Sequence, residues 1–309
     1  MKYSVFIDGA AGTTGLEIRE RLAGRDEIAL VTLDDAQRKN PEARRQALND
    51  AAFVILCLPD DAARESVSLI DNARTRVIDA STAHRTADGW AYGFAELEPS
   101  QGATIAEAAR VTNPGCYPTG FLALVRPLVR AGLIPADWAL SCNAVSGYSG
   151  GGRSMIADFE DGGAATAWRG YALDLGHKHV PEMQRHARLE HAPIFMPSVA
   201  NTYRGMVVEV PLALHALPRR PTIEACTEAL ETAYQGSGIV RVANDSPSLV
   251  RIEDDAGSDR LTLRVLGNAE RGQARLIATL DNLGKGAAGA AVQNLNIMAG
   301  LDPTAGLVL

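Results

Sequence analysis

The chain begins with a strand, a glycine-rich turn and a helix in immediate succession, and this order constrains the fold more than any other feature. Residues 3–7 favour a β-strand. The apolar positions of the next segment recur at helical spacing, at Leu16, Ile18 and Leu22. A second strand is expected over residues 27–33. Such a strand–helix–strand unit predicts the start of a parallel sheet.

Three further segments extend this alternation. AFVILCLP, at residues 52–59, is a nearly continuous apolar run, which is typical of a strand buried on both faces of a parallel sheet. A helix is predicted over residues 61–73 and another strand over residues 76–81. Strands and helices in such short alternation predict a doubly wound α/β domain.

After Cys116 the pattern changes to longer strands with few helices. The strand candidates are MVVEVPLAL, RLTLRVLG and ARLIATLDN. One helix is expected between them over residues 222–234, and the tail segment GKGAAGAAVQNLNIMAG returns to helical spacing. Long strands with few helices predict a second, α+β domain built on an antiparallel sheet.

The composition excludes several classes of protein. With 309 residues, 46% hydrophobic and 22% charged, the chain has room for two ordinary globular domains. Its net charge of −7 argues against nucleic acid as the main partner, and no apolar run reaches membrane-spanning length. Its four cysteines form no CxxC pair, which fits a reducing cytoplasm better than a disulfide framework or a zinc ribbon. We therefore expect a cytoplasmic enzyme.

The glycine turn is the first candidate binding site. Because it ends a strand and opens a helix, its backbone N–H groups and the helix dipole converge where an anion can bind. An ordinary turn that merely needs glycine is the alternative, but the position inside a strand–helix–strand unit favours a dinucleotide. The candidate cofactor-binding residues are Gly9, Ala11, Gly12, Thr13, Thr14 and Gly15.

The residues after the second strand bear on the choice between NAD and NADP. Asp34 and Asp35 are placed to hold a ribose hydroxyl, whereas Arg38 and Lys39 are placed to pair with a 2′-phosphate. A solvated loop without a role accounts for these four residues almost as well. The residues alone favour NADP slightly, with Arg38 as a cofactor contact.

Cys116 lies in NPGCYPTG, directly before an apolar run with helical spacing. Pro118 suits the first turn of that helix, and Pro127 is expected to kink or shorten it. The positive end of the helix dipole favours thiolate over thiol, and Gly115 lets a substrate or a nicotinamide ring approach the sulfur. An inert buried cysteine is the alternative, and it suits the other three cysteines better. We therefore predict that Cys116 is a nucleophile.

A thiolate beside a nicotinamide narrows the chemistry. The sulfur takes up an acyl group as a thioester, and hydride transfer interconverts the thioester and a thiohemiacetal. Acyl-phosphate reduction and aldehyde oxidation both follow this logic.

Five stretches of the chain resemble N-acetyl-gamma-glutamyl-phosphate reductases, in the same order. They are GAAGTTG, DASTAHR, VTNPGCYPTGFLALVRP, VSGYSGGGR with GHKHVPE, and DNLGKGAAGAAVQ. The resemblance covers nearly the whole chain, and the length and the STAHR stretch resemble the shorter form of this reductase. Longer relatives usually carry Asp-Phe where this chain has Ala83 and His84, and Thr112 is larger than the residue expected there.

The resemblance implies a domain plan and a cofactor. It implies a dinucleotide-binding domain over residues 1–115, an α+β domain with the dimer contacts over 116–284, and a C-terminal helix over 285–309 that packs back on the first domain. The resemblance also implies that NADPH is the cofactor. A homo-oligomer, either a dimer or a tetramer, is expected as well. No nucleic acid, membrane or metal is expected as a partner.

The stretch GHKHVPE supplies the expected acid, since a thioester reductase must protonate an oxygen as hydride arrives. The resemblance points to His179, with His177 as the second choice and Glu182 placed to orient the imidazole. A zinc site is the alternative for His-x-His with a nearby acid, but no further ligands are apparent in the sequence.

The remaining candidates surround substrate and cofactor. Asn113 is a candidate donor to the developing oxyanion, a role that backbone amides can also fill. The glycine-rich loop after residue 145 can cradle a phosphate or carboxylate, unless it is only a connection. The candidate substrate-binding residues are Arg85, Ser146, Ser149, Gly150, Arg153, His177 and Glu182. Ser81, Lys285 and Gly286 are candidate cofactor contacts, although a plain helix start accounts for the last two almost as well.

The predicted activity is NADPH-dependent reduction of N-acetyl-gamma-glutamyl phosphate to N-acetylglutamate semialdehyde with release of phosphate, in arginine biosynthesis. Aspartate-semialdehyde dehydrogenase and N-acetyl-aminoadipyl-phosphate reductase are the alternatives with the same cysteine chemistry. A non-catalytic dinucleotide sensor is the alternative from another class. A cysteine amidohydrolase is the last alternative, because that activity does not account for the glycine turn.

Overall fold

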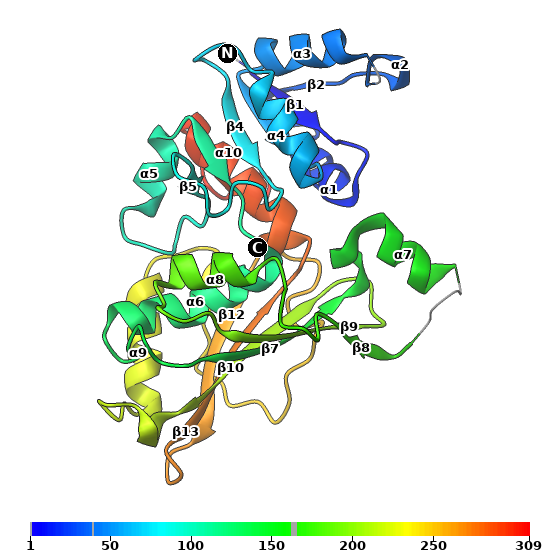
Figure 1. Cartoon of the computed structure of the whole chain (residues 1–309). Helices are drawn as coiled ribbons and strands as arrows, with labels where there is room; N and C mark the ends of the chain where they lie inside the picture. The colour runs from blue at the N-terminus through cyan, green and yellow to red at the C-terminus, as the bar shows by residue number, and fades with distance from the viewer. Residues whose placement is uncertain (1, 39, 162–165) are drawn as a thin grey trace. The chain divides into compact units, whose positions relative to one another are not determined.

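The computed structural model describes residues 2–38, 40–161 and 166–309, which fall into two compact units (Figure 1). Unit 1 consists of Met1–Ala95, Ser100–Pro114 and Ala287–Leu307. Unit 2 consists of Glu96–Pro99, Gly115–Gly286 and Val308–Leu309. The short segment Glu96–Pro99 belongs to unit 2 although both of its flanks belong to unit 1, which no sequence pattern indicated.

In its described residues, unit 1 contains a parallel sheet of six strands in the order β2-β1-β3-β4-β6-β5. The strands are β1 (Tyr3–Asp8), β2 (Ile28–Val31), β3 (Phe53–Leu56), β4 (Arg76–Asp79), β5 (Ala91–Tyr92) and β6 (Arg110–Thr112). The helices are α1 (Thr13–Leu22), α2 (Asp35–Arg38), α3 (Pro41–Asp50), α4 (Asp60–Ser68), α5 (Gln101–Glu107) and α10 (Gly289–Ala299). The order reverses between β1 and β3, so the predicted doubly wound α/β domain is confirmed.

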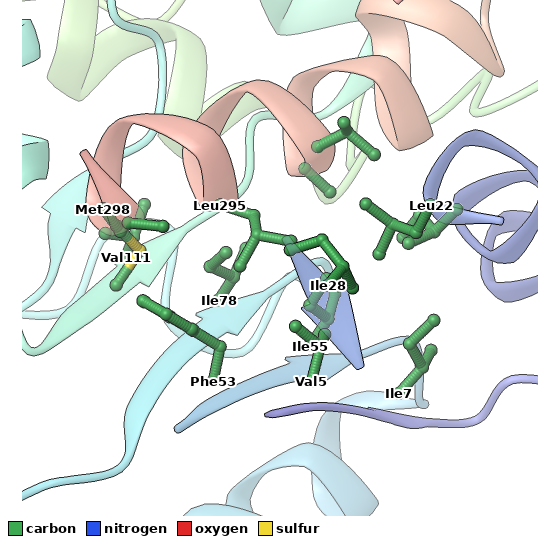
Figure 2. Close-up of a cluster of buried hydrophobic side chains, with 14 of the residues drawn as sticks. Val5, Ile7, Leu22, Ile28, Phe53, Ile55, Ile78, Val111, Leu295 and Met298 are labelled. Carbon is green, nitrogen blue, oxygen red and sulfur yellow. The ribbon is translucent and has the colours of Figure 1, made fainter. Parts of the chain in front are cut away.

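Both faces of this sheet are covered by helices. Phe53 and Ile55 point into an apolar cluster shared with α1 and α10, whereas Val54 and Leu56 join a second cluster with α3 and α4. Figure 2 shows Leu295 of α10 among side chains of the strands. Burying an apolar side chain of this size contributes about 1.5–3 kcal/mol. This two-sided burial is the physical reason for the continuous apolar run at residues 52–59.

In its described residues, unit 2 contains a seven-stranded sheet in the order β11-β12-β13-β10-β7-β9-β8. The strands are β7 (Ser141–Gly147), β8 (Trp168–Gly170), β9 (Ile194–Ala200), β10 (Met206–Ala213), β11 (Val240–Val242), β12 (Leu261–Asn268) and β13 (Gln273–Leu280). β7 with β9 and β11 with β12 pair in parallel, and the other neighbours are antiparallel. The α+β domain is confirmed, but its sheet is mixed rather than antiparallel throughout.

Unit 2 also contains helices, which are labelled in Figure 1. They are α6 (Cys116–Arg130), α7 (Gly152–Glu160), α8 (Val180–Ala187) and α9 (Ile223–Tyr234), with 3-10 turns η1 (Tyr148–Gly151) and η2 (Leu214–Ala216) and the π-helical turn η3 (Gly284–Ala288) before α10. α9 matches the predicted helix, whereas α7 and α8 were not predicted. Among the described residues, no helix combines the length and apolar character that a membrane crossing requires.

α6 runs through Pro127 to Arg130, so the expectation that Pro127 shortens the helix is wrong. A proline lacks the N–H that would bind the carbonyl four residues earlier, which here belongs to Ala123. The hydroxyl of Tyr234 donates to that carbonyl instead, at 2.8 Å. The helix therefore continues because α9 supplies the missing hydrogen bond.

Candidate active site

Cys116 is half-buried and is the first residue of α6, whereas the sequence placed it just before the helix. The N-cap residue is Gly115, whose backbone amide donates to Oε1 of Glu182 at 2.8 Å. Glu182 is 1% exposed and lies in the first turn of α8. A carboxylate at a helix N-terminus is worth about 0.3–1 kcal/mol, more where it is buried. Glu182 thus fixes the residue directly before the nucleophile.

The two predicted histidines lie together at the start of α8. His179 is the N-cap residue of that helix, and its backbone amide donates to Nδ1 of His177 at 3.1 Å. Their ring centroids are 4.7 Å apart. The ring of Tyr117, the residue after Cys116, lies 5.9 Å from that of His179. Contact between α6 and α8 therefore brings the imidazoles to the start of the helix that carries the cysteine.

Two tyrosines line the same region. The hydroxyl of Tyr171 donates to the hydroxyl of Tyr117 at 3.3 Å, and Tyr117 donates to the carbonyl of Ser198 at 2.9 Å. Burial raises the pKa of Tyr117 well above its usual value. Burial, with a further contribution from the charge of Cys116, raises the pKa of Tyr171 to about 12. Both phenols therefore stay neutral hydrogen-bond donors around neutral pH.

The hexapeptide at residues 281–286, just after β13, also contributes to the site. A Cβ at Gly286 would lie 2.9 Å from Cβ of Cys116 and 3.0 Å from the carbonyl oxygen of Asp281, so only glycine fits there. Asn282 is buried, and its side-chain amide donates to Oγ of Ser149 at 2.9 Å. One hexapeptide thus contacts both the nucleophile and the glycine-rich loop.

Lys285 lies in the same hexapeptide and is 2% exposed. Its Nζ is 2.8 Å from Oε2 of Glu96, which belongs to the short segment of unit 2 before α5. The predicted cofactor contacts at Lys285 and Gly286 remain predictions. Within unit 2, the structure shows Gly286 packed against Cys116 and Lys285 paired with Glu96.

The predicted glycine-rich loop forms the end of β7, the turn η1 and the start of α7. Ser146 and Ser149 are both buried, and the hydroxyl of Ser146 donates to the carbonyl of Gly147 at 3.0 Å. Gly150 and Arg153 are exposed. The serines therefore hold the loop together, and its exposed groups are the ones placed to meet a ligand.

In unit 1, the predicted glycine turn connects β1 with α1. Gly9 has φ +90°, and a Cβ there would lie 2.3 Å from the carbonyl oxygen of Cys57. Gly12 is the N-cap residue of α1 and has no side chain to cap it, and a Cβ at Gly15 would lie 2.6 Å from the carbonyl oxygen of Gly9. Because these glycines have no side chains, an anion can approach the backbone at the N-terminus of α1. The turn also contains the half-buried residues Ala11, Thr13 and Thr14.

A cavity of about 500 Å³ lies at the carboxyl ends of β1 and β2. Its lining includes Gly9, Thr32, Leu58 and two cations that the sequence analysis missed, Arg19 and Arg44. A cavity of this size at the switch in strand order fits part of a dinucleotide. The missed signal was the position of Arg19, one helical turn beyond the glycine turn.

The loop after β2 does not resolve the choice of cofactor by itself. Asp34 caps α2, because its Oδ1 accepts from the backbone amides of Ala36 and Gln37 at 3.0 and 2.8 Å. The side chain of Arg38 and all of Lys39 lie outside the described residues. The predicted role of Arg38 therefore stays a prediction.

Asn113 and Arg85 are joined in unit 1. Nε of Arg85 donates to the backbone carbonyl of Asn113 at 3.0 Å, and Nη2 donates to the carbonyl of Ala80 at 3.0 Å. The side-chain amide of Asn113 donates to the carbonyl of Ala287 and accepts from Asn294. Both residues are buried, so each braces the chain just before Cys116. Their predicted contacts with substrate remain predictions.

The metal alternative receives no support from this geometry. Among residues 2–38, 40–161 and 166–309, no group of three or more histidine, cysteine, aspartate or glutamate side chains is arranged to hold a metal ion. His177 instead uses Nδ1 to accept a backbone hydrogen bond.

Family models match both units. Residues 4–105 match "Semialdehyde dehydrogenase, NAD binding domain", and residues 116–282 match "Semialdehyde dehydrogenase, dimerisation domain". The chain is 52% identical to the N-acetyl-gamma-glutamyl-phosphate reductase of Brucella ovis over 310 residues, covering 97% of the chain and 100% of that protein. It is 51% identical to N-acetyl-gamma-glutamyl-phosphate reductase 2 of Pseudomonas putida, covering 96% of each. The chain belongs to the N-acetyl-gamma-glutamyl-phosphate reductase family.

Solved structures of related enzymes share the fold of this reductase family member. Aspartate semialdehyde dehydrogenase II of Vibrio cholerae matches with a TM-score of 0.71 at 20% identity, covering 97% of this chain and 99% of that one. Aspartate semialdehyde dehydrogenase of Francisella tularensis matches with a TM-score of 0.71 at 13% identity, covering 96% and 100%. At these identities the likeness concerns the fold alone.

The other three cysteines of this reductase family member should resist alkylation in the native protein. Burial raises the pKa of Cys57 to about 12 and that of Cys226 to about 11, and it raises the pKa of Cys142 further. A raised thiol pKa keeps the proton on sulfur below that pKa, so at about pH 8 roughly one in a thousand or fewer of these thiols is ionised. Iodoacetamide followed by peptide mass spectrometry should label Cys116 first. Equal labelling of Cys57 and Cys116 would contradict this.

Proposed function

We propose that the protein is an NADPH-dependent reductase that converts N-acetyl-gamma-glutamyl phosphate into N-acetylglutamate semialdehyde and inorganic phosphate, a step of arginine biosynthesis. The observation that carries the proposal is Cys116 at the first residue of α6, with His179 at the start of the contacting helix α8. Identity of 52% to reductases of that name supports the choice of substrate.

Cys116 begins the reaction as the nucleophile. Its thiolate attacks the acyl carbon, the carbon–oxygen bond to the phosphate breaks, and inorganic phosphate leaves with the bonding electrons. The α6 dipole favours the charged sulfur. Glu182 and Gly286 hold the first residues of α6, so the sulfur is positioned before substrate arrives.

Unit 1 fits the cofactor. Gly9, Gly12 and Gly15 would hold its phosphates at the N-terminus of α1, and the cavity beside them would take the adenosine half. Arg19 supplies positive charge at that cavity, which suits the additional phosphate of NADPH, whereas the charge of Arg44 is paired with Asp8 at 2.9 Å. When bound, NADPH supplies the hydride that reduces the thioester.

His179 handles the proton. Reduction places negative charge on the substrate oxygen, and an imidazole can deliver a proton to it near neutral pH. The hydrogen bond from the backbone amide of His179 to His177 fixes the turn that carries the ring. When the thiohemiacetal collapses, the same imidazole takes the hydroxyl proton back, the carbon–sulfur bond breaks, and the aldehyde is released while Cys116 leaves as thiolate.

Initial rates with three acyl phosphates test the substrate assignment. NADPH consumption should be at least about tenfold faster with N-acetylglutamyl phosphate than with aspartyl phosphate or N-acetyl-aminoadipyl phosphate, because a site built for one side chain leaves polar groups unpaired with another. A faster rate with either alternative would reassign the substrate while keeping the cysteine chemistry. No NADPH consumption with any of the three would contradict the proposed function.

Exposed apolar side chains on the unit 2 sheet are evidence for a homodimer. Along β9, Phe195 is buried, whereas Ile194 is 51% and Met196 44% exposed. Trp168 is 59% exposed at the edge of the same sheet, beside a cavity of about 500 Å³. A large exposed apolar surface marks an interaction site. A second copy is the expected occupant because residues 116–282 match a model described as a dimerisation domain.

Lysines on this surface should separate the copies. The double change Ile194→Lys and Met196→Lys should convert a dimer to a monomer in size-exclusion chromatography with light scattering, because buried unpaired charge is costly. Leu249→Lys is the matched control, since Leu249 is 63% exposed elsewhere in unit 2. A dimer that survives the double change would place the interface elsewhere.

A further inference from the structure

We infer that His84 binds the nicotinamide–ribose half of the cofactor through Nε2; this inference rests on the proposed NADPH dependence. His84 lies in the loop at residues 80–85, which follows β4 at the carboxyl edge of the unit 1 sheet. The cavity described above lies at β1 and β2, while β4 lies beyond the switch between β1 and β3. A dinucleotide spans such a switch, one half on each side, so β4 belongs to the second half.

The other polar groups of this loop are already engaged within unit 1. The carboxylate of Asp79 is fully buried and accepts from the amide of Ser81 at 2.9 Å and from its hydroxyl at 2.8 Å. Oγ of Ser81 in turn accepts from the amide of Ala83 at 3.1 Å. Thr82 bonds to Asp60. The predicted cofactor contact at Ser81 thus competes with hydrogen bonds inside the loop.

The ring of His84 is held in place by two neighbours. Nδ1 lies 2.6 Å from Oδ2 of Asp79, and the imidazole stacks on Trp90 with ring centroids 4.1 Å apart and planes 14° apart. A carboxylate only accepts, so Nδ1 carries a proton. The side chain is 13% exposed, and the described part of the chain supplies no hydrogen bond to Nε2.

The hydrogen-bonding capacity of Nε2 of His84 determines which groups of the cofactor it can bind. Nε2 accepts a hydrogen bond when the imidazole is neutral and donates one when it is charged. The ribose hydroxyls and the carboxamide of a nicotinamide riboside both donate and accept, so they satisfy Nε2 in either state. His84 is a group with a preset orientation, and little rotamer freedom is lost when it binds.

Two substitutions at this position separate ligand binding from bracing of the loop. In His84→Asn the side-chain amide nitrogen should take the place of Nδ1 and keep the hydrogen bond to Asp79. No atom of the asparagine reaches the position of Nε2. In His84→Gln the longer side chain places its amide near the position of Nε2. His191→Asn is the matched control, because His191 is exposed in unit 2.

The test measures Kd for NADPH by the fluorescence of the reduced nicotinamide, with full-length protein and no substrate. His84→Asn should raise this Kd about tenfold, His84→Gln should stay within about threefold, and neither should change the Kd for 2′,5′-ADP. Wild-type affinity for NADPH in His84→Asn would overturn the inference alone. Equal weakening of NADPH and 2′,5′-ADP would also overturn it, because it would show that His84 only braces the loop. Failure of the unaltered protein to bind NADPH would overturn both the inference and the proposed function.

Discussion

Replacing Cys116 with serine should reduce turnover by more than about a thousandfold, because a serine hydroxyl is scarcely ionised at neutral pH whereas a thiol at a helix N-terminus is. The side chain keeps nearly the same size, so α6 should still begin at this residue with Gly115 bonded to Glu182. Turnover is measured as NADPH oxidation with N-acetylglutamyl phosphate, and NADPH binding by fluorescence.

NADPH affinity of the Cys116→Ser protein should stay within about twofold of the unaltered protein, because the glycine turn belongs to unit 1. Cys226→Ser is the matched control, since Cys226 is a buried thiol on α9 with no part in the reaction. Turnover close to normal in Cys116→Ser would refute the nucleophile assignment.

The second large effect is expected at Gly286. In Gly286→Ala the new methyl group would lie 2.9 Å from Cβ of Cys116 and 3.0 Å from the carbonyl oxygen of Asp281. Neither neighbour is the mobile end of a long side chain, so the start of α6 or the backbone of residues 281–286 must shift. A displacement of about 1 Å at a reacting group can cost about a hundredfold in rate, and we expect a loss of kcat of that order.

Gly102→Ala is the matched control for this change. Gly102 lies in α5, and a Cβ there would meet nothing within 4 Å. An alanine in a helix should stabilise the protein by about 0.5–1 kcal/mol and leave kcat unchanged. Unchanged kcat in Gly286→Ala would mean that the contact with Cys116 does not position the sulfur.

The architecture of unit 1 follows from local patterns in the sequence. The run at residues 52–59 indicated burial on both faces, and Phe53 and Val54 do point into different apolar clusters. Pro127 is the opposite case. Local rules predict that this residue kinks or shortens α6, but the hydroxyl of Tyr234, on another helix, donates to the carbonyl that the proline leaves without a donor. A prediction from neighbouring residues has no means to include that partner.

In the candidate site, too, local features were predictable from the sequence and long-range contacts were not. Cys116 was identified by the residues on either side of it, because a helix N-terminus is a local feature. The bond between Gly115 and Glu182 joins residues 67 positions apart, and the bond between Ser149 and Asn282 joins residues 133 apart. The predicted role of Glu182 in orienting an imidazole stays a prediction, and the structure adds that its carboxylate holds the start of α6. Such pairings depend on the packed fold and leave no periodic trace in the sequence.

Covalent catalysis by Cys116 is tested by the mass of the enzyme after rapid mixing with N-acetylglutamyl phosphate in the absence of NADPH. We expect one N-acetylglutamyl group per chain and the release of one equivalent of phosphate. Peptide mapping should locate the group on Cys116, and addition of NADPH should discharge it. Phosphate release without a covalent adduct, or an adduct on any other residue, would contradict covalent catalysis by Cys116.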